Sequence, residues 1–236
     1  MVFSSNIFLF VFLPAFLGIY FLSPTRWRNA WIVLGSYAFY AWWRLDFLAL
    51  FVGVTLVNYV VGRRIFAAQA VEAHASARRW MVAGVVADLA VLGYFKYANF
   101  GVDSFNLMLT SAGVAPFHLA DIVLPIGISF YTFQAVSYVI DVYRRDTPPA
   151  DNLVDFAAFI ALFPQLIAGP VLRYKDLAPQ FKHRPLSADL FGEGVARFMQ
   201  GFIKKVLIAD SVAPLVDAGF ALEDPTMADA CLCQSS

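Results

Sequence analysis

The chain has 236 residues, of which 60% are hydrophobic and only 14% are charged. Soluble domains carry about 25% charged residues, so this composition predicts an integral membrane protein. The net charge is zero at pH 7, which excludes a general electrostatic attraction to nucleic acid. Cys231 and Cys233 are too close together and too near the end of the sequence to frame a fold.

The apolar runs are long enough to predict membrane-spanning helices, which need about 20 mainly apolar residues each. No Lys or Arg precedes the first run, which favours a retained span over a signal peptide. The expected fold is an all-α polytopic membrane protein with about five transmembrane helices, a re-entrant hairpin and interfacial helices. The five spans are predicted at Asn6–Leu22, Asn29–Trp43, Phe47–Gly62, Trp80–Tyr97 and Ile122–Val142.

Lys and Arg gather in alternate connecting segments, and this asymmetry predicts the orientation. Arg26 and Arg28 follow the first run, and four arginines lie in Arg63–Arg79, which we expect to be a flexible aqueous loop. Asn99–Asp121 carries neither Lys nor Arg and is expected to be an amphipathic excursion at the opposite surface. The N-terminus is therefore predicted on the periplasmic side.

The sixth apolar run, Leu153–Pro170, conflicts with this orientation if it crosses the membrane, because the basic segment Val171–Pro185 would then lie outside. Pro164 and Gly169–Pro170 also interrupt a helix. A broken backbone is tolerated at membrane depth only where protein or water satisfies its polar groups. We therefore predict a re-entrant hairpin that returns Val171 to the cytoplasmic side.

The last predicted element is a helix over Ser187–Ala209, where apolar pairs recur every four residues between polar and charged positions. This pattern is typical of a helix that lies along the membrane surface. Pro214 follows shortly and is expected to limit any further extension.

The segment Leu124–Arg144 combines an apolar span with one polar face. Its polar residues lie at positions i, i+3, i+4 and i+7 of a helix. Polar groups that face hydrocarbon are costly, so this face is expected to meet other helices or a water-filled path. Two interpretations stay open: a packed polar seam, or the lining of a substrate path. The face consists of Gln134, Ser137, Tyr138 and Asp141.

Other candidate residues have a structural and a functional interpretation each. Asp88, in the middle of an apolar run, is either a functional carboxylate or a partner in a helix–helix hydrogen bond. Asn58 is expected to hydrogen-bond between helices. Arg173 and Lys175 either bind an anionic ligand, such as a nucleotide phosphate, or anchor the cytoplasmic surface. Soluble-enzyme signatures and Cys/His metal spacings are missing, so no metal site is assigned.

Six segments occur in a characteristic order along nearly the whole chain, to about Asp229. They are MVFSSNIFLFVFLP at the start, then Ser36–Trp43, Leu92–Phe100, Leu124–Arg144, Phe163–Leu177 and Arg197–Asp210. Together they closely resemble the membrane-bound O-acyltransferase family, and most of all its bacterial members that O-acetylate alginate.

The resemblance implies a multi-pass enzyme of the bacterial inner membrane. Such proteins take an acyl group from a cytoplasmic donor, here expected to be acetyl-CoA, and no bound cofactor is implied. They pass it toward a periplasmic partner acetyltransferase and an exopolysaccharide such as alginate, after a histidine removes a proton from the nucleophile. In this setting the polar face of Leu124–Arg144 becomes a candidate channel wall, and Arg173 and Lys175 become the candidate donor entrance.

The sequence departs from the family pattern in one respect. The family's catalytic histidine lies in a Trp-His context beyond this length, and no Trp-His pair occurs here, so no catalytic residue is assigned. We expect residues 1–230 to be the N-terminal part of an acyltransferase domain that is inactive alone, and residues 231–236 a truncated or frameshifted tail. The alternatives are transfer of D-alanine or another acyl group to a cell-wall polymer, and a non-enzymatic membrane scaffold or conduit.

Overall fold

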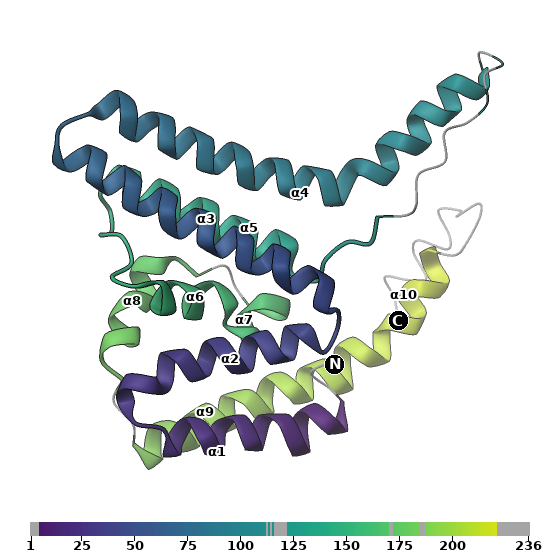
Figure 1. Cartoon of the computed structure of the whole chain (residues 1–236). Coiled ribbons are helices and arrows are strands. Elements are labelled where there is room, and N and C mark those ends of the chain that lie inside the picture. Colours follow the sequence, from purple (N-terminus) through teal and green to yellow (C-terminus); the bar gives the residue numbers. More distant parts are fainter. Residues whose placement is uncertain are drawn as a thin grey trace. The chain divides into compact units, whose positions relative to one another are not determined.

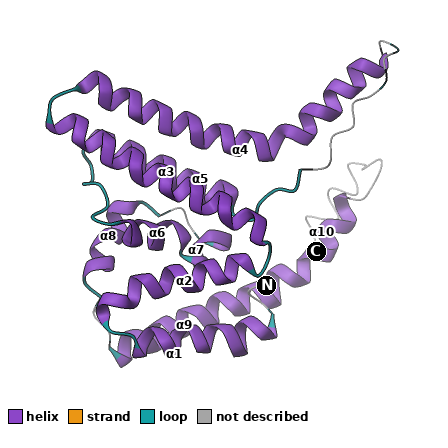
Figure 2. Ribbon diagram, viewed as in Figure 1, coloured by secondary structure: helices purple, strands orange, loops and turns teal. Residues whose placement is uncertain are grey.

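The computed structural model describes residues 5–111, 113, 115, 122–169, 172–184 and 187–220. These residues form helices and connecting segments with no strand among them, which confirms the all-α class (Figure 2). The chain divides into two units, each described by itself below. One holds Leu13–His183, and the other holds Val2–Phe12 and Arg184–Ser236.

The helices of the larger unit are labelled α1 to α8 in Figure 1. They are α1 (Leu13–Leu22), α2 (Arg28–Ala41), α3 (Leu45–Ala70), α4 (His74–Ser111), α5 (Ile128–Arg144), α6 (Leu153–Ala161), α7 (Phe163–Ala168) and α8 (Tyr174–Lys182), with a 3-10 turn at Thr25–Trp27 before α2. The smaller unit contains a π-helix at Phe8–Phe12, α9 (Ala188–Ile203), a second π-helix at Lys204–Ala209, and α10 (Asp210–Phe220).

α3 and α4 form an antiparallel hairpin (Figure 1). The prediction of a flexible loop over Arg63–Arg79 is wrong, because α3 continues to Ala70 and α4 begins at His74. The alanine-rich sequence of this segment has a strong helix propensity, which explains why the helices extend into it. α4 also continues through Asn99 to Ser111, where a separate surface excursion was expected.

Both α3 and α4 are long and apolar enough to cross a membrane. Apolar side chains such as Leu56 and Val86 are exposed, whereas the polar Asn58 and Asp88 are buried between the two helices. This distribution is the reverse of that in a soluble bundle and is suited to surrounding lipid. The count of five spans stays a prediction, since α2 has 14 residues and α5 has 17.

The run Leu153–Pro170 is interrupted between α6 and α7 at Leu162, whose φ of −51° and ψ of 102° are not helical. Pro164 lies in the first turn of α7, where a missing backbone N–H leaves no helical hydrogen bond unmade. The helical break therefore exists, but its depth in a membrane stays a prediction.

The core of the larger unit surrounds α5, which contacts α3, α4, α6, α7 and α8. Tyr131, Tyr138 and Val139 of α5 are fully buried. A hydrogen bond of 2.7 Å from Gln69 Nε2 to the carbonyl oxygen of Tyr143 joins the ends of α3 and α5. α5 thus lies among five other helices of the larger unit, and its position fixes the candidate site.

In the smaller unit, α9 begins at Ala188, next to the predicted start at Ser187, and Ser187 Oγ caps it by accepting a hydrogen bond of 3.1 Å from Leu190 N. The expectation that Pro214 limits the helix is wrong, since Pro214 lies inside α10, which continues to Phe220. A proline in a helix interior removes one backbone donor and weakens the helix, but it does not always end it. Residues 231–236, the expected tail, lie outside the described residues.

Candidate functional site

Both ends of α5 are held by tight backbone geometry. Gly127 caps its start with φ 75°, and a Cβ built there would lie 2.7 Å from the carbonyl oxygen of Leu166 in α7. Only glycine allows this approach and this φ without strain. At the other end Arg145 has φ 65°, and its N–H donates to the carbonyl oxygen of Val142 at 3.1 Å. The register of the polar face is therefore fixed from both sides.

Most of the polar face of α5 is buried within the larger unit. This burial fits both sequence interpretations, the packed polar seam and the lining of a substrate path. Gln134 is 1% exposed and Asp141 is 3% exposed. Ser137 differs, because it is half-buried and its hydroxyl donates to the carbonyl oxygen of Gln134 within the same helix. The structure therefore brings Gln134 and Asp141 into the interior and leaves Ser137 beside them.

Several polar atoms of this face have no hydrogen-bond partner among the described residues: both amide atoms of Gln134, Nε2 and Oε1, and the carboxylate Oδ2 of Asp141. A buried polar group left without a partner costs about 1–3 kcal/mol. Native proteins rarely retain such groups without water, ligand or a further protein segment to satisfy them. This face is consequently the strongest candidate for a site that holds water or substrate.

Tyr138 has a clear packing role. Its hydroxyl accepts a hydrogen bond of 3.1 Å from Ala150 N, which ties the segment before α6 to α5. Its ring centroid lies 4.5 Å from that of Phe156 and 5.2 Å from that of Tyr174. Burial in this aromatic cluster raises the pKa of Tyr174 above its ordinary value. A place for Tyr138 in a channel wall stays a prediction.

Arg173 and Lys175, the predicted donor entrance, differ in position. Arg173 Nη1 lies 4.0 Å from Asp141 Oδ1, so this half-exposed arginine reaches the end of the α5 face. Lys175 is exposed on α8 and forms no ion pair with the described residues. Only Arg173 is therefore connected to the buried site.

Asn58 and Asp88 form the helix–helix hydrogen bond that one sequence interpretation expected. Asn58 Nδ2 donates to Asp88 Oδ1 at 2.8 Å and joins α3 to α4. The other carboxylate oxygen of Asp88 and Oδ1 of Asn58 are buried without a partner among the described residues. No group of three or more His, Cys, Asp or Glu that could hold a metal ion occurs in the described part of the chain.

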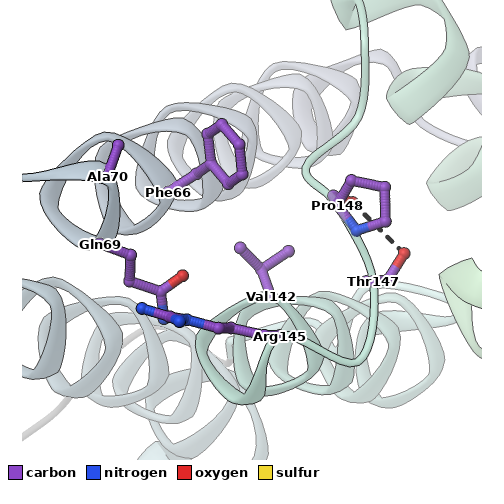
Figure 3. Close-up of a pocket in the computed structure, with 7 residues that line it drawn as sticks. All are labelled: Phe66, Gln69, Ala70, Val142, Arg145, Thr147 and Pro148. Carbon is purple, nitrogen blue, oxygen red and sulfur yellow. Dashed lines mark hydrogen bonds between the residues drawn. The ribbon is translucent and has the colours of Figure 1, made fainter.

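The sequence interpretation missed a groove at the C-terminal ends of α3 and α5. One part of it encloses about 420 Å³, and Figure 3 shows Gln69 and Arg145 at one edge with Phe66 and Pro148 across from them. A second part of about 490 Å³ adjoins it and is lined by Arg63 and Arg64. The signal was present in the arginines of this segment, but assigning them to a flexible loop hid their common position.

Comparison with known proteins gives close relatives. A "Probable alginate O-acetylase" of Azotobacter vinelandii is 65% identical over 232 residues, which are 98% of this chain and 46% of the relative. The Pseudomonas aeruginosa protein of the same name is 64% identical over 98% of this chain and 44% of its own length. The resemblance to the membrane-bound O-acyltransferases is confirmed.

A more distant relative of the family is the "Peptidoglycan O-acetyltransferase" of Helicobacter pylori, which is 34% identical over 93% of this chain and 46% of its own length. The chain spans about half the length of the curated relatives it matches. No family model matches the chain. No solved structure matches it either.

Proposed function

We propose that this chain forms part of a membrane O-acetyltransferase that moves acetyl groups from cytoplasmic acetyl-CoA toward a periplasmic polysaccharide such as alginate. The observation that carries the proposal is the 64–65% identity, over 98% of the chain, to two proteins named alginate O-acetylase. The relative named for peptidoglycan, at 34% identity, supports a cell-wall polymer as the second candidate acceptor.

The polar face of α5 supports a role in the transfer path. An acetyl thioester that enters a bilayer needs hydrogen-bond donors at its carbonyl oxygen, because hydrocarbon provides none. Gln134 has a buried amide with no partner among the described residues and can provide such a donor through Nε2. Asp141 lies at the far end of the same face, within ion-pair distance of Arg173. In this proposal Gln134 orients the acetyl group, and no proton transfer is assigned to it.

The distribution of basic residues supports the proposed topology in the inner membrane. The C-terminal ends of α3 and α5 carry Arg63, Arg64, Arg144 and Arg145 and are assigned to the cytoplasm, with the N-terminus in the periplasm. Lys182, at the end of α8, forms an ion pair with Asp151, just before α6. This pairing links the end of α8 to the segment before α6, which is compatible with the proposed re-entrant hairpin. Periplasmic acetyltransferase proteins are the proposed partners.

A chimera tests the proposed function. This chain replaces the matched 232 residues of the Azotobacter vinelandii relative, and the chimera is expressed in an alginate-producing strain that lacks its own O-acetylase. The O-acetyl content of secreted alginate is measured. We expect the chimera to restore acetylation. Gln134→Leu should reduce it at least about tenfold, because it removes one hydrogen bond to a developing charge. Ser137→Ala should leave it nearly unchanged. An inactive chimera, or equal activity in the Gln134→Leu variant, contradicts the proposal.

A further inference from the structure

The groove at the C-terminal ends of α3 and α5 is built from two adjoining hollows. Phe66 and Pro148 line both of them, so the two hollows adjoin. Hollows of about 420 and 490 Å³ fall in the range of small-molecule sites. Val142, next to Asp141, lines the first hollow, so the groove adjoins the end of the α5 polar face.

The charge of the groove is positive. Arg63 and Arg64 line one hollow and Arg145 lines the other. Asp151, the acidic residue in the lining, is already paired with Lys182. Among the described residues, no carboxylate lies within ion-pair distance of the three arginines. Their guanidinium groups are thus available for an anion from outside the chain.

Specific backbone and side-chain contacts hold groups around the groove. Arg145 is in the left-handed region at φ 65°, an uncommon conformation for a non-glycine residue. Gln69, which lies beside Arg145 in Figure 3, is fixed by its hydrogen bond to the carbonyl oxygen of Tyr143. The Arg64 guanidinium lies over the Trp80 ring, 5.9 Å from its centroid. Contacts of this kind lower the entropic cost of ordering the basic side chains around a ligand.

The remaining lining is apolar. Phe66, Ala70, Val142 and Pro148 form a surface against which a flat or hydrocarbon group can pack. Arginine pairs with phosphate through two parallel hydrogen bonds, which makes it the preferred residue for such groups. The combination suits a ligand that carries both a phosphate and an apolar part.

We propose that this groove binds a phosphate-bearing ligand, with the phosphates between Arg63 and Arg145 and the apolar part against Phe66 and Pro148. The inference deepens, and rests on, the proposed acetyl-CoA-dependent transfer, because the 3′-phosphate, pyrophosphate and adenine of coenzyme A present this chemistry. The headgroup of an acidic phospholipid presents the same phosphate chemistry at a membrane surface.

The test measures binding, so it does not depend on turnover. The purified chain is placed in nanodiscs of phosphatidylcholine, and its affinity for coenzyme A and for 3′-dephospho-coenzyme A is measured by calorimetry. The Arg63→Gln/Arg145→Gln variant is compared with Arg78→Gln/Arg79→Gln. This control pair removes two exposed arginines from the start of α4, which do not line the groove. A second series replaces coenzyme A with vesicles that contain phosphatidylglycerol.

We expect the groove variant to lose at least about tenfold in affinity for coenzyme A, because it loses charged hydrogen bonds to the phosphates. The affinity of the control variant should stay within about twofold of that of the parent chain. Loss of phosphatidylglycerol binding alone assigns the site to a lipid phosphate. Equal effects of both variants, or no binding of either ligand, overturn the inference. If coenzyme A binding needs Arg63 and Arg145 but the chimera transfers no acetyl group, only the proposed function fails.

Discussion

Gly62 marks a tight contact between α3 and α5. A Cβ at this position would lie 2.6 Å from Tyr138 Oη. Tyr138 has no room to move, because it is fully buried and its hydroxyl accepts a hydrogen bond from Ala150 N. Close approach of α3 to α5 therefore requires glycine at this position.

We expect Gly62→Ala to destabilise the chain by about 1–3 kcal/mol through overpacking, measured as a lower thermal unfolding temperature in detergent. Gly53→Ala in the same helix is the matched control, because its Cβ would meet nothing within 4 Å. The control should be stabilised slightly, since alanine is the better helix former. Equal unfolding temperatures for the two variants would show that Tyr138 can shift.

Gly127 offers a second test at the scale of one residue, because it combines a left-handed backbone with a close contact. It has φ 75° and lies against the carbonyl oxygen of Leu166. Gly113 has a similar φ of 74° but open space around it. Gly127→Ala should cost about 1–3 kcal/mol more than Gly113→Ala, in denaturant titrations of the two variants. A difference near zero would show that the α5–α7 contact adjusts freely.

The α3–α4 hairpin depends on polar groups buried at an apolar interface. Asn58 and Asp88 hydrogen-bond across it, and an interhelical bond in a membrane contributes about 1 kcal/mol. Asn58→Leu and Asp88→Leu each leave the other polar group without its partner, whereas the double variant leaves neither. We therefore expect the double variant to be less destabilised than the sum of the single variants, measured by a double-mutant cycle of unfolding. Strict additivity would exclude coupling between the two side chains.

The presence of apolar helices could be predicted from the sequence, whereas the lengths of these helices could not. The runs around Asn29–Trp43 and Phe47–Gly62 predicted α2 and α3, because long apolar runs favour helices in lipid. The extension of α3 to Ala70 was missed because AAQAVEAHASA is polar enough to read as a loop, although its alanines favour helix. The position of Pro214 inside α10 was missed because proline usually ends a helix, although a helix can continue past one.

Only part of the candidate site could be predicted from the sequence, because periodicity places residues on a helix face but does not give their contacts. Periodicity placed Gln134 and Asp141 on one face of a helix, and both are buried there. The same periodicity could not separate Tyr138, which anchors Ala150, from a channel-lining residue, because both roles need a polar group on that face. The groove at Arg63 and Arg145 depends on two segments that meet only in the fold.

At the scale of the whole molecule, the basic residues predict one orientation. A cysteine at Lys182 should react with a membrane-impermeant thiol reagent from the cytoplasmic side only, and a cysteine at Ser111 from the periplasmic side only. Sided membrane vesicles provide the measurement, with Cys231 and Cys233 replaced by serine. Reaction of the Lys182→Cys variant from the periplasmic side would reverse the proposed return of the chain after α7.

The central claim is that the polar face of α5 lines a water-filled path rather than a packed seam. Labelling of Gln134→Cys by a small, permanently charged methanethiosulfonate reagent tests it most directly, with Cys231 and Cys233 again replaced by serine. Phe133→Cys is the control, because Phe133 is 49% exposed and the proposal places it against lipid. The reagent needs water and an ionised thiol, so we predict that Gln134→Cys reacts in the folded chain and Phe133→Cys does not. A Gln134→Cys variant that reacts only after denaturation would contradict the claim.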